Sequence, residues 1–83
     1  MKTYLFVAER GASVQQLITA MDERGIDTQL FVGDDPDSVQ IRANYDITTH
    51  PAALVTLDDG TYVYMWQGAL PTVAELQYMV QGR

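Results

Sequence analysis

The sequence contains no cysteine among its 83 residues. A disulfide framework, a thiolate metal site and any reaction that needs a protein thiolate are therefore excluded. Basic residues are also few: the chain has five Lys and Arg and eleven Asp and Glu, which gives a net charge of −6. A chain of this charge repels phosphate backbones, so we expect no nucleic-acid binding. The acidic groups at 34–37 and 58–59 are expected in solvated loops, with a weak cation site as the alternative.

Long apolar runs are absent as well. The first apolar stretch, Tyr4–Ala8, has five residues, whereas a secretory signal needs about 7–15 and a membrane span about 20. A buried strand explains it better, and we expect a cytoplasmic protein (of the host cell, if the source is a virus) with no membrane contact. The one histidine, His50, lacks the companions that zinc requires, so no metal and no cofactor is expected.

Length and hydrophobic periodicity predict one α/β domain over residues 1–83. Its elements follow the order β-α-β-α-β-β-α. Asp58-Asp59-Gly60 marks a hairpin turn between the last two strands. The strands are expected at residues 3–8, Thr28–Val32, 52–57 and Tyr62–Trp66.

Capping signals mark the start of each predicted helix. The first and last helices begin with the spacing S-x-x-Q or T-x-x-E, in which two residues satisfy each other's backbone N–H groups. An Asp-Pro pair begins the middle helix, and Gly25 ends the first one. The capping residues are Ser13 with Gln16, Asp35 with Pro36, and Thr72 with Glu75.

Apolar residues at helical spacing predict which helix faces are buried. The first and last helices each carry one stripe, and the middle helix carries two (i, i+4) pairs. The residues are Val14, Leu17, Ile18 and Met21; Val39 with Ala43 and Ile41 with Tyr45; and Val73, Leu76, Met79 and Val80.

The order of elements restricts the topology of the sheet. A parallel first pair of strands needs a right-handed crossover through the first helix, and the hairpin adds two strands on the other side. We therefore expect a four-stranded mixed sheet in which residues 3–8 lie between Thr28–Val32 and residues 52–57, with Tyr62–Trp66 at the edge. The first and last helices are expected on one face and the middle helix on the other.

Two short segments, together with this topology, carry a resemblance to a known family. Tyr45–Pro51 resembles the thioredoxin stretch in which a helix-ending tyrosine and an isoleucine precede a cis-proline. Gly68–Leu70 and the capped helix after it resemble the thioredoxin C-terminal end. The chain is thus similar to the thioredoxin/glutaredoxin superfamily over nearly its whole length. The resemblance implies a minimal thioredoxin-like fold with a cis bond before Pro51.

The resemblance also locates the position of the family's reactive cysteine pair. Counting back from Gly25, Gly11 and Val14 match the two cysteine positions of glutaredoxin-like sequences, and the turn reads Gly-Ala-Ser-Val. Thiol–disulfide exchange needs a thiolate to attack and a sulfur to leave, so this chain cannot perform it. We therefore expect a protein that is not an enzyme.

A weaker resemblance covers the first half of the chain. Leu5–Ala8, the turn after it and Ser13 look like the start of the KaiB clock proteins. The Asp35-Pro36 pair and Ile47–Pro51 are compatible with the same pattern. KaiB proteins are also thioredoxin-like and work by binding partners, so this likeness implies a binding role too.

These observations predict a redox-inactive module that binds a protein or peptide. In the thioredoxin family the proline loop presents backbone groups of the residue before the proline to an extended peptide, and this needs no thiol. The oligomeric state is left open. The predicted binding surface comprises Arg10, Gly11, Ala12, Ser13, Thr49, His50, Pro51, Gly68 and Ala69.

The main alternative is a small-ligand site for glutathione or a related anionic thiol peptide, or a glutaredoxin-derived accessory protein. Glutaredoxin-like proteins hold glutathione along the proline loop and at the start of the last helix. Arg10 is the one cation expected near that site. Ser13 and His50 imitate a nucleophile and a base, but the sequence offers no third residue to orient the imidazole, so hydrolysis is not expected.

Aromatic residues alternate in the last predicted strand. Tyr62, Tyr64 and Trp66 are expected to project from one face of that strand. One interpretation is core packing beneath the last helix. The other is an exposed aromatic patch on an edge strand, which would mark a partner site.

Overall fold

The computed structural model describes residues 1–81, and within them the elements follow the predicted order. Periodicity placed each element within a few residues of its observed bounds, because the alternation of buried and exposed positions is a local property of the chain. The elements are β1 (Lys2–Val7), α1 (Ala12–Glu23), β2 (Thr28–Val32), α2 (Pro36–Asn44), β3 (Ala52–Thr56), β4 (Tyr62–Gln67) and α3 (Val73–Gln81).

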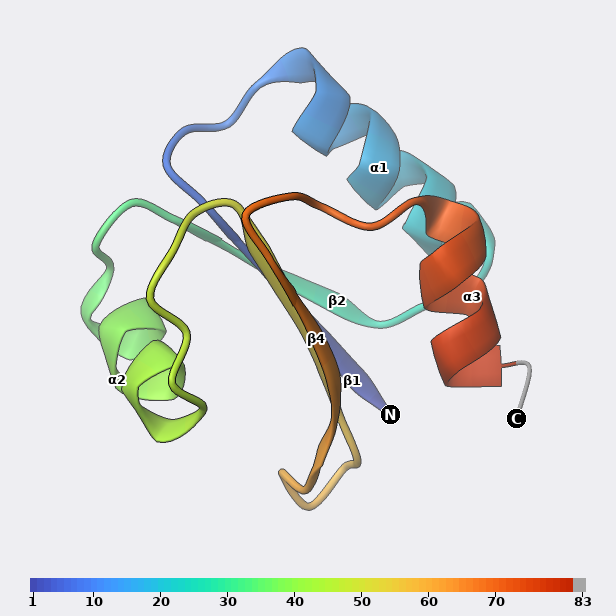
Figure 1. Cartoon of the computed structure of the whole chain (residues 1–83). Helices are drawn as coiled ribbons and strands as arrows, with labels where there is room; N and C mark the ends of the chain where they lie inside the picture. Colours follow the sequence, from blue (N-terminus) through green and yellow to red (C-terminus); the bar gives the residue numbers. More distant parts are fainter. Residues whose placement is uncertain (82–83) are drawn as a thin grey trace.

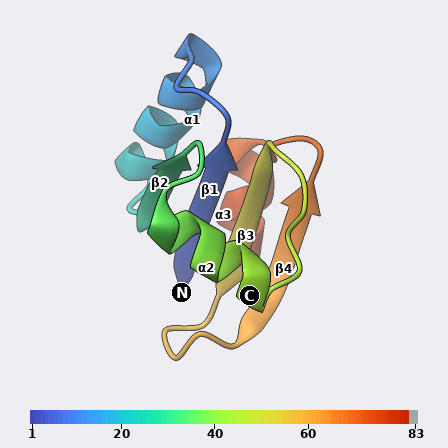
Figure 2. The same ribbon diagram turned by 90° about the vertical axis from the view of Figure 1, so that its left-hand side faces the viewer.

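The strands form one mixed sheet in the order β2-β1-β3-β4, which confirms the predicted topology. β1 pairs with β2 in parallel, whereas the β1–β3 and β3–β4 pairs are antiparallel. Helices α1 and α3 lie on one face of the sheet and α2 lies on the other (Figures 1 and 2). β4 is therefore an edge strand that borders α3. No helix in the described part of the chain is long and apolar enough to cross a membrane.

Each face of the sheet has its own hydrophobic core. Successive side chains of β1 and β3 alternate between the two cores, and all five residues of β3 are buried because helices cover both faces. Leu30 and Phe31 lie on opposite faces, as predicted. The core beneath α1 and α3 contains Leu5, Met21, Ile26, Ala53, Val55 and Leu76; the core beneath α2 contains Phe6, Phe31, Ile47, Ala52 and Leu54.

The N-cap of helix α1 lies two residues before the predicted cap, Ser13. Gly11 is the N-cap, with extended backbone (φ −102°, ψ 176°), and its carbonyl accepts the first helical bond from the Gln15 N–H at 3.1 Å. Ser13 is already inside the helix, so the predicted Ser13–Gln16 capping box is wrong, because a cap must precede the first helical turn. The predicted C-terminal end of α1 is confirmed, because Gly25 follows the last turn of the helix and has a φ of +70°.

Helix α2 begins as predicted, since Asp35 Oδ1 accepts the Asp37 N–H at 2.9 Å. Its buried face is narrower than the sequence suggested. The pair Ile41 and Tyr45 packs against the core, whereas Val39 is 47% exposed. The fully buried residue of this helix is Ser38, and positions 38, 41 and 45 have the i, i+3, i+7 spacing of one helical face.

The alternation in β4 is interrupted by a bulge. Val55 pairs with Tyr64, but Thr56 pairs with Tyr62, so Val63 is an extra residue without a partner in β3. The bulge puts Tyr62 on the opposite face from Tyr64 and Trp66, and the predicted common face for all three is wrong. Trp66 packs partly against the core beneath α3, whereas Tyr64 is 45% exposed, so both interpretations of the aromatic residues hold in part.

Candidate binding surface at the proline loop

The loop between α2 and β3 is fixed at its first half by Asp46 and Ile47. Asp46 adopts a left-handed backbone (φ +58°), which lets the chain turn back on the helix end. The Ile47 N–H then donates to the Arg42 carbonyl at 2.9 Å, and the Ile47 side chain is buried in the core beneath α2. The following residues are thereby directed along the edge of the sheet.

The second half of the loop is fixed from the end of β4. Gln67 Oε1 accepts hydrogen bonds from the Thr48 N–H at 3.1 Å and the Thr49 hydroxyl at 3.5 Å. The Gly68 N–H donates to the Pro51 carbonyl at 2.9 Å. The His50–Pro51 peptide bond is cis, which confirms the prediction. Residues 48–51 are thus held in place from one neighbouring strand end.

A cleft of about 270 Å³ lies between this loop, the end of β1 and the start of α1. Its floor includes Val7 and Val14, which are 3% and 8% exposed. The cleft brings together three of the predicted site residues, Ser13, His50 and Pro51. The other lining residues are Val7, Ala8, Glu9, Val14 and Leu70.

The remaining predicted residues border the cleft without lining it. Arg10 is directed to the surface of α1, where its guanidinium donates to Gln15 Oε1 at 2.9 and 3.2 Å. Gly11 caps α1, and Ala12 is exposed on the outer face of that helix.

The predicted residues on the proline loop and after β4 that do not line the cleft, Thr49, Gly68 and Ala69, also border it. The Thr49 hydroxyl is bonded to Gln67, and Gly68 supports Pro51 through its backbone. Ala69 is exposed next to Leu70. Leu70, which the predicted site did not include, lines the cleft instead and also packs against the core beneath α1 and α3. The sequence signal for Leu70 was its place in the segment Gly68–Leu70, which resembles the thioredoxin C-terminal end.

The polar groups of the cleft do not form a catalytic arrangement of the hydrolase type. His50 Nε2 is buried and has no hydrogen-bond partner among the described residues, so no bond joins it to Ser13. Glu9 places a carboxylate at the cleft, and no Lys or Arg is among the described residues that line it. Nor does any group of three or more His, Asp or Glu side chains within residues 1–81 have a metal-binding arrangement.

The backbone of His50 is a polar feature at the cleft that is available to a ligand. Within the described part of the chain, no backbone–backbone hydrogen bond outside helices and strands uses the His50 N–H or carbonyl. Backbone groups of this kind need a partner, either water or another chain. A pair of unpaired backbone groups beside an apolar cleft can accept one more extended segment.

Comparison with solved structures supports the fold. Thioredoxin 1 from the thermophilic eubacterium Thermosipho africanus superposes with a TM-score of 0.65 at 14% sequence identity, over 99% of this chain and 92% of that chain. No protein-family model matches the chain, and neither does any curated protein sequence. The chain therefore has a thioredoxin-like fold, as its sequence predicted, and it has that fold without any cysteine.

Proposed function

We propose that this protein is a redox-inactive, thioredoxin-like module that binds an extended segment of a partner protein in the cleft beside the proline loop. The observation that carries the proposal is that the His50 backbone, at the edge of that cleft, makes no backbone hydrogen bond within the described part of the chain. Binding of an extended segment uses main-chain hydrogen bonds for affinity and a pocket for specificity. Neither contribution needs a thiol.

The cleft favours a particular kind of segment. Its floor and wall are apolar at Val7, Val14 and Leu70, so an apolar side chain of the partner gains by burial there. Glu9 adds a carboxylate at the same cleft, which favours a basic neighbour and repels an acidic one. The preferred ligand is thus an extended segment with an apolar residue next to a Lys or Arg.

Glutathione is the less favoured ligand. Its carboxylates would meet Glu9 in the cleft, while the guanidinium of Arg10 is already bonded to Gln15. The net charge of −6 further disfavours an anionic ligand. No thiol is available for a mixed disulfide. The peptide proposal therefore takes precedence over the small-ligand alternative.

The proposal is tested by selecting peptides from a random display library on the wild-type protein and measuring their affinities for two variants. His50→Arg adds a positive charge at the cleft, which repels the basic residue of the preferred segment, and Gln40→Arg adds the same charge on α2, across the sheet. We expect His50→Arg to weaken binding at least about tenfold, a change of roughly 1.4 kcal/mol, and Gln40→Arg to leave it unchanged. Equal affinities for all three proteins would contradict the proposal. A glutathione titration in parallel reports on the alternative.

A further inference from the structure

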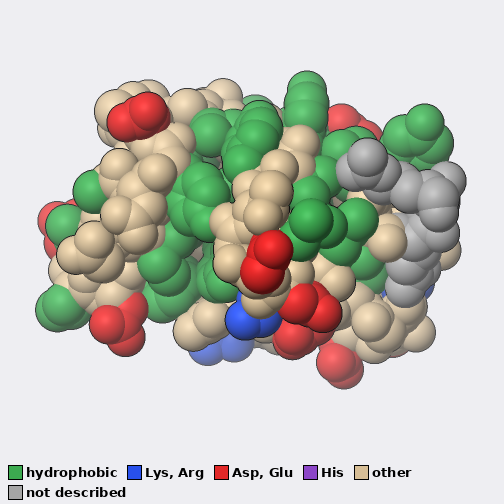
Figure 3. Space-filling view, turned by 90° about the horizontal axis from the view of Figure 1, so that it is seen from below, with side chains coloured by type: hydrophobic (Ala, Val, Ile, Leu, Met, Phe, Trp, Pro, Cys, Tyr) green, Lys and Arg blue, Asp and Glu red, His purple; other side chains and the backbone are tan. Residues whose placement is uncertain are grey.

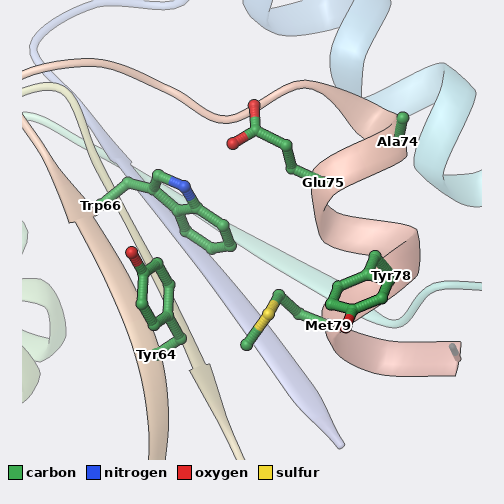
Figure 4. A pocket seen from close by; sticks show the side chains of 6 residues that line it. All are labelled: Tyr64, Trp66, Ala74, Glu75, Tyr78 and Met79. Carbon is green, nitrogen blue, oxygen red and sulfur yellow. The ribbon is translucent and has the colours of Figure 1, made fainter. Parts of the chain in front are cut away.

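A second concave surface lies between the edge strand β4 and helix α3. It is a groove of about 510 Å³, and it shares no lining residue with the proline-loop cleft. Figure 4 shows Tyr64 and Trp66 on the strand side and Tyr78 and Met79 on the helix side. The lining residues are Tyr64, Trp66, Ala74, Glu75, Tyr78 and Met79.

Three of the six residues that line the groove are aromatic. Tyr64 and Trp66 are in edge contact, with ring centroids 4.9 Å apart and an interplanar angle of 73°. Tyr64 remains 45% exposed and Tyr78 is 68% exposed. Large aromatic side chains gathered in one groove and left open to solvent are typical of a binding site.

A carboxylate lies at one end of the groove. Glu75 Oε1 accepts hydrogen bonds from the Thr72 N–H at 3.0 Å and the Thr72 hydroxyl at 3.2 Å, which also confirms the predicted capping box of α3. These two bonds, with a smaller contribution from the Trp66 indole, lower the pKa of Glu75. The carboxylate is thus ionised and fixed in direction at neutral pH. Figure 4 shows it turned toward the Trp66 ring.

The combination of aromatic faces with one fixed carboxylate selects a positively charged ligand. Aromatic faces attract cations, and quaternary ammonium groups are bound by clusters of such rings. No Lys or Arg is among the described residues that line the groove, so none of these side chains competes with such a ligand. Seen from the hairpin side, hydrophobic side chains cover much of the surface, with several acidic groups among them and little basic surface (Figure 3).

We propose that the groove between β4 and α3 binds a small organic ammonium compound, with its cationic head group between Tyr64, Trp66 and Tyr78 and directed toward Glu75. A small molecule fits better than a macromolecule because the volume lies in the range of about 300–1,000 Å³ that is usual for such sites. The site is independent of the proline-loop cleft, and either proposal can fail without the other.

Trp66 provides the readout, because it is the one tryptophan of the chain and lines the groove. The probe is choline, and the matched control is its neutral isostere 3,3-dimethyl-1-butanol, which has the same shape without the charge. We expect choline to change Trp66 fluorescence with a dissociation constant on the order of 1 mM and the isostere to bind about tenfold more weakly.

Three variants complete the test. Tyr78→Leu removes one ring from an exposed helix position, and Glu75→Gln removes the charge while keeping an oxygen that can accept the Thr72 bonds. Each is expected to weaken choline binding about five- to tenfold. Tyr62→Leu, on the other face of β4, is expected to leave binding unchanged, and circular dichroism checks that all variants are folded. Equal binding of choline and its isostere, no fluorescence change with choline, or an equal loss in Tyr62→Leu would overturn the proposal.

Discussion

The Gly68 N–H donates a 2.9 Å hydrogen bond to the carbonyl of Pro51, and this bond joins the end of β4 to the start of β3 at the edge of the cleft. Gly68 adopts a left-handed backbone with φ +86°. From Gly68 the chain continues to Leu70, which lines the cleft. One backbone conformation thus supports both Pro51 and Leu70.

Replacing Gly68 tests that conformation. A Cβ at this position meets no atom within 4 Å, so the cost of Gly68→Ala is the backbone penalty of a left-handed L-residue, roughly 1–2 kcal/mol. For a domain of this size we expect the melting temperature to fall by about 4–16 °C. The control is Gly11→Ala, where φ is −102° and the left-handed penalty does not apply, so that only the smaller cost of Ala in place of Gly at an N-cap remains. A loss in Gly68→Ala no larger than in the control would contradict the role of this glycine.

The start of α1 gives a prediction that separates two capping schemes. Because Gly11 and not Ser13 precedes the first turn, Ser13→Ala removes no cap. We expect it to leave stability unchanged or to raise it by up to about 0.5 kcal/mol through helix propensity. Gly11→Ser adds a capping side chain and is expected to gain a few tenths of a kcal/mol. Urea unfolding measures both, and a loss of about 1 kcal/mol in Ser13→Ala would restore the capping box.

Two aliphatic residues near α2, one buried beneath the helix and one exposed on it, are expected to differ in how much their truncation to Ala lowers the free energy of unfolding. Leu54 is fully buried beneath this helix, so Leu54→Ala is expected to cost about 2–5 kcal/mol. Val39 is 47% exposed on the far side of the helix, and Val39→Ala is expected to change stability by less than about 0.5 kcal/mol. Urea midpoints compare the two. A Val39→Ala variant as destabilised as Leu54→Ala would mean that α2 is rotated about its axis.

The capping box of α3 predicts a pH dependence. Hydrogen bonds from Thr72 lower the pKa of Glu75 below 4.5. A carboxyl group whose pKa is lower in the folded state stabilises the fold above its unfolded pKa, and this contribution is lost as the pH falls through the folded pKa. The melting temperature of the wild type is therefore expected to exceed that of Glu75→Gln at neutral pH. The difference shrinks as the pH falls below 4.5.

Asp59 also has a lowered pKa, from the Thr61 side chain and backbone. It is present in both proteins, so its own loss of stabilisation at low pH cancels in the comparison. A melting-temperature difference between wild type and Glu75→Gln that stays constant across this pH range would contradict the assignment of the shift to Glu75.

Local patterns in the sequence predicted much of the fold. The apolar stripe from Val14 to Met21 and the T-x-x-E spacing before α3 act within one or two helical turns, so neighbouring residues alone determine them. The N-cap of α1 was predicted wrongly, because the S-x-x-Q spacing pointed to Ser13, whereas the helix begins directly after Gly11. The path of the chain from β1 into the helix decides between them, and that path is set by tertiary packing.

The cleft and the groove could be predicted less well. Ser13, His50 and Pro51 were assigned to one surface through the family resemblance, but Glu9 and Leu70 were not, because they reach the cleft only when three distant segments meet. At the groove, Tyr64 and Trp66 lie on one face as their alternation predicted, but Tyr62 does not, because the bulge at Val63 changes the face on which Tyr62 lies. Strict alternation in the sequence gives no sign of a bulge, since it arises from the pairing with β3.

The most direct test of the peptide-binding proposal is to map a selected peptide on the protein by backbone amide NMR. With the tightest peptide from the display selection, we expect shift changes to cluster at residues 7–14, 48–51 and 68–70. The His50 amide is expected to be among the most shifted, because a peptide hydrogen bond would reach it directly. Shifts that cluster instead along β4 and α3, with residues 48–51 unmoved, would contradict the account.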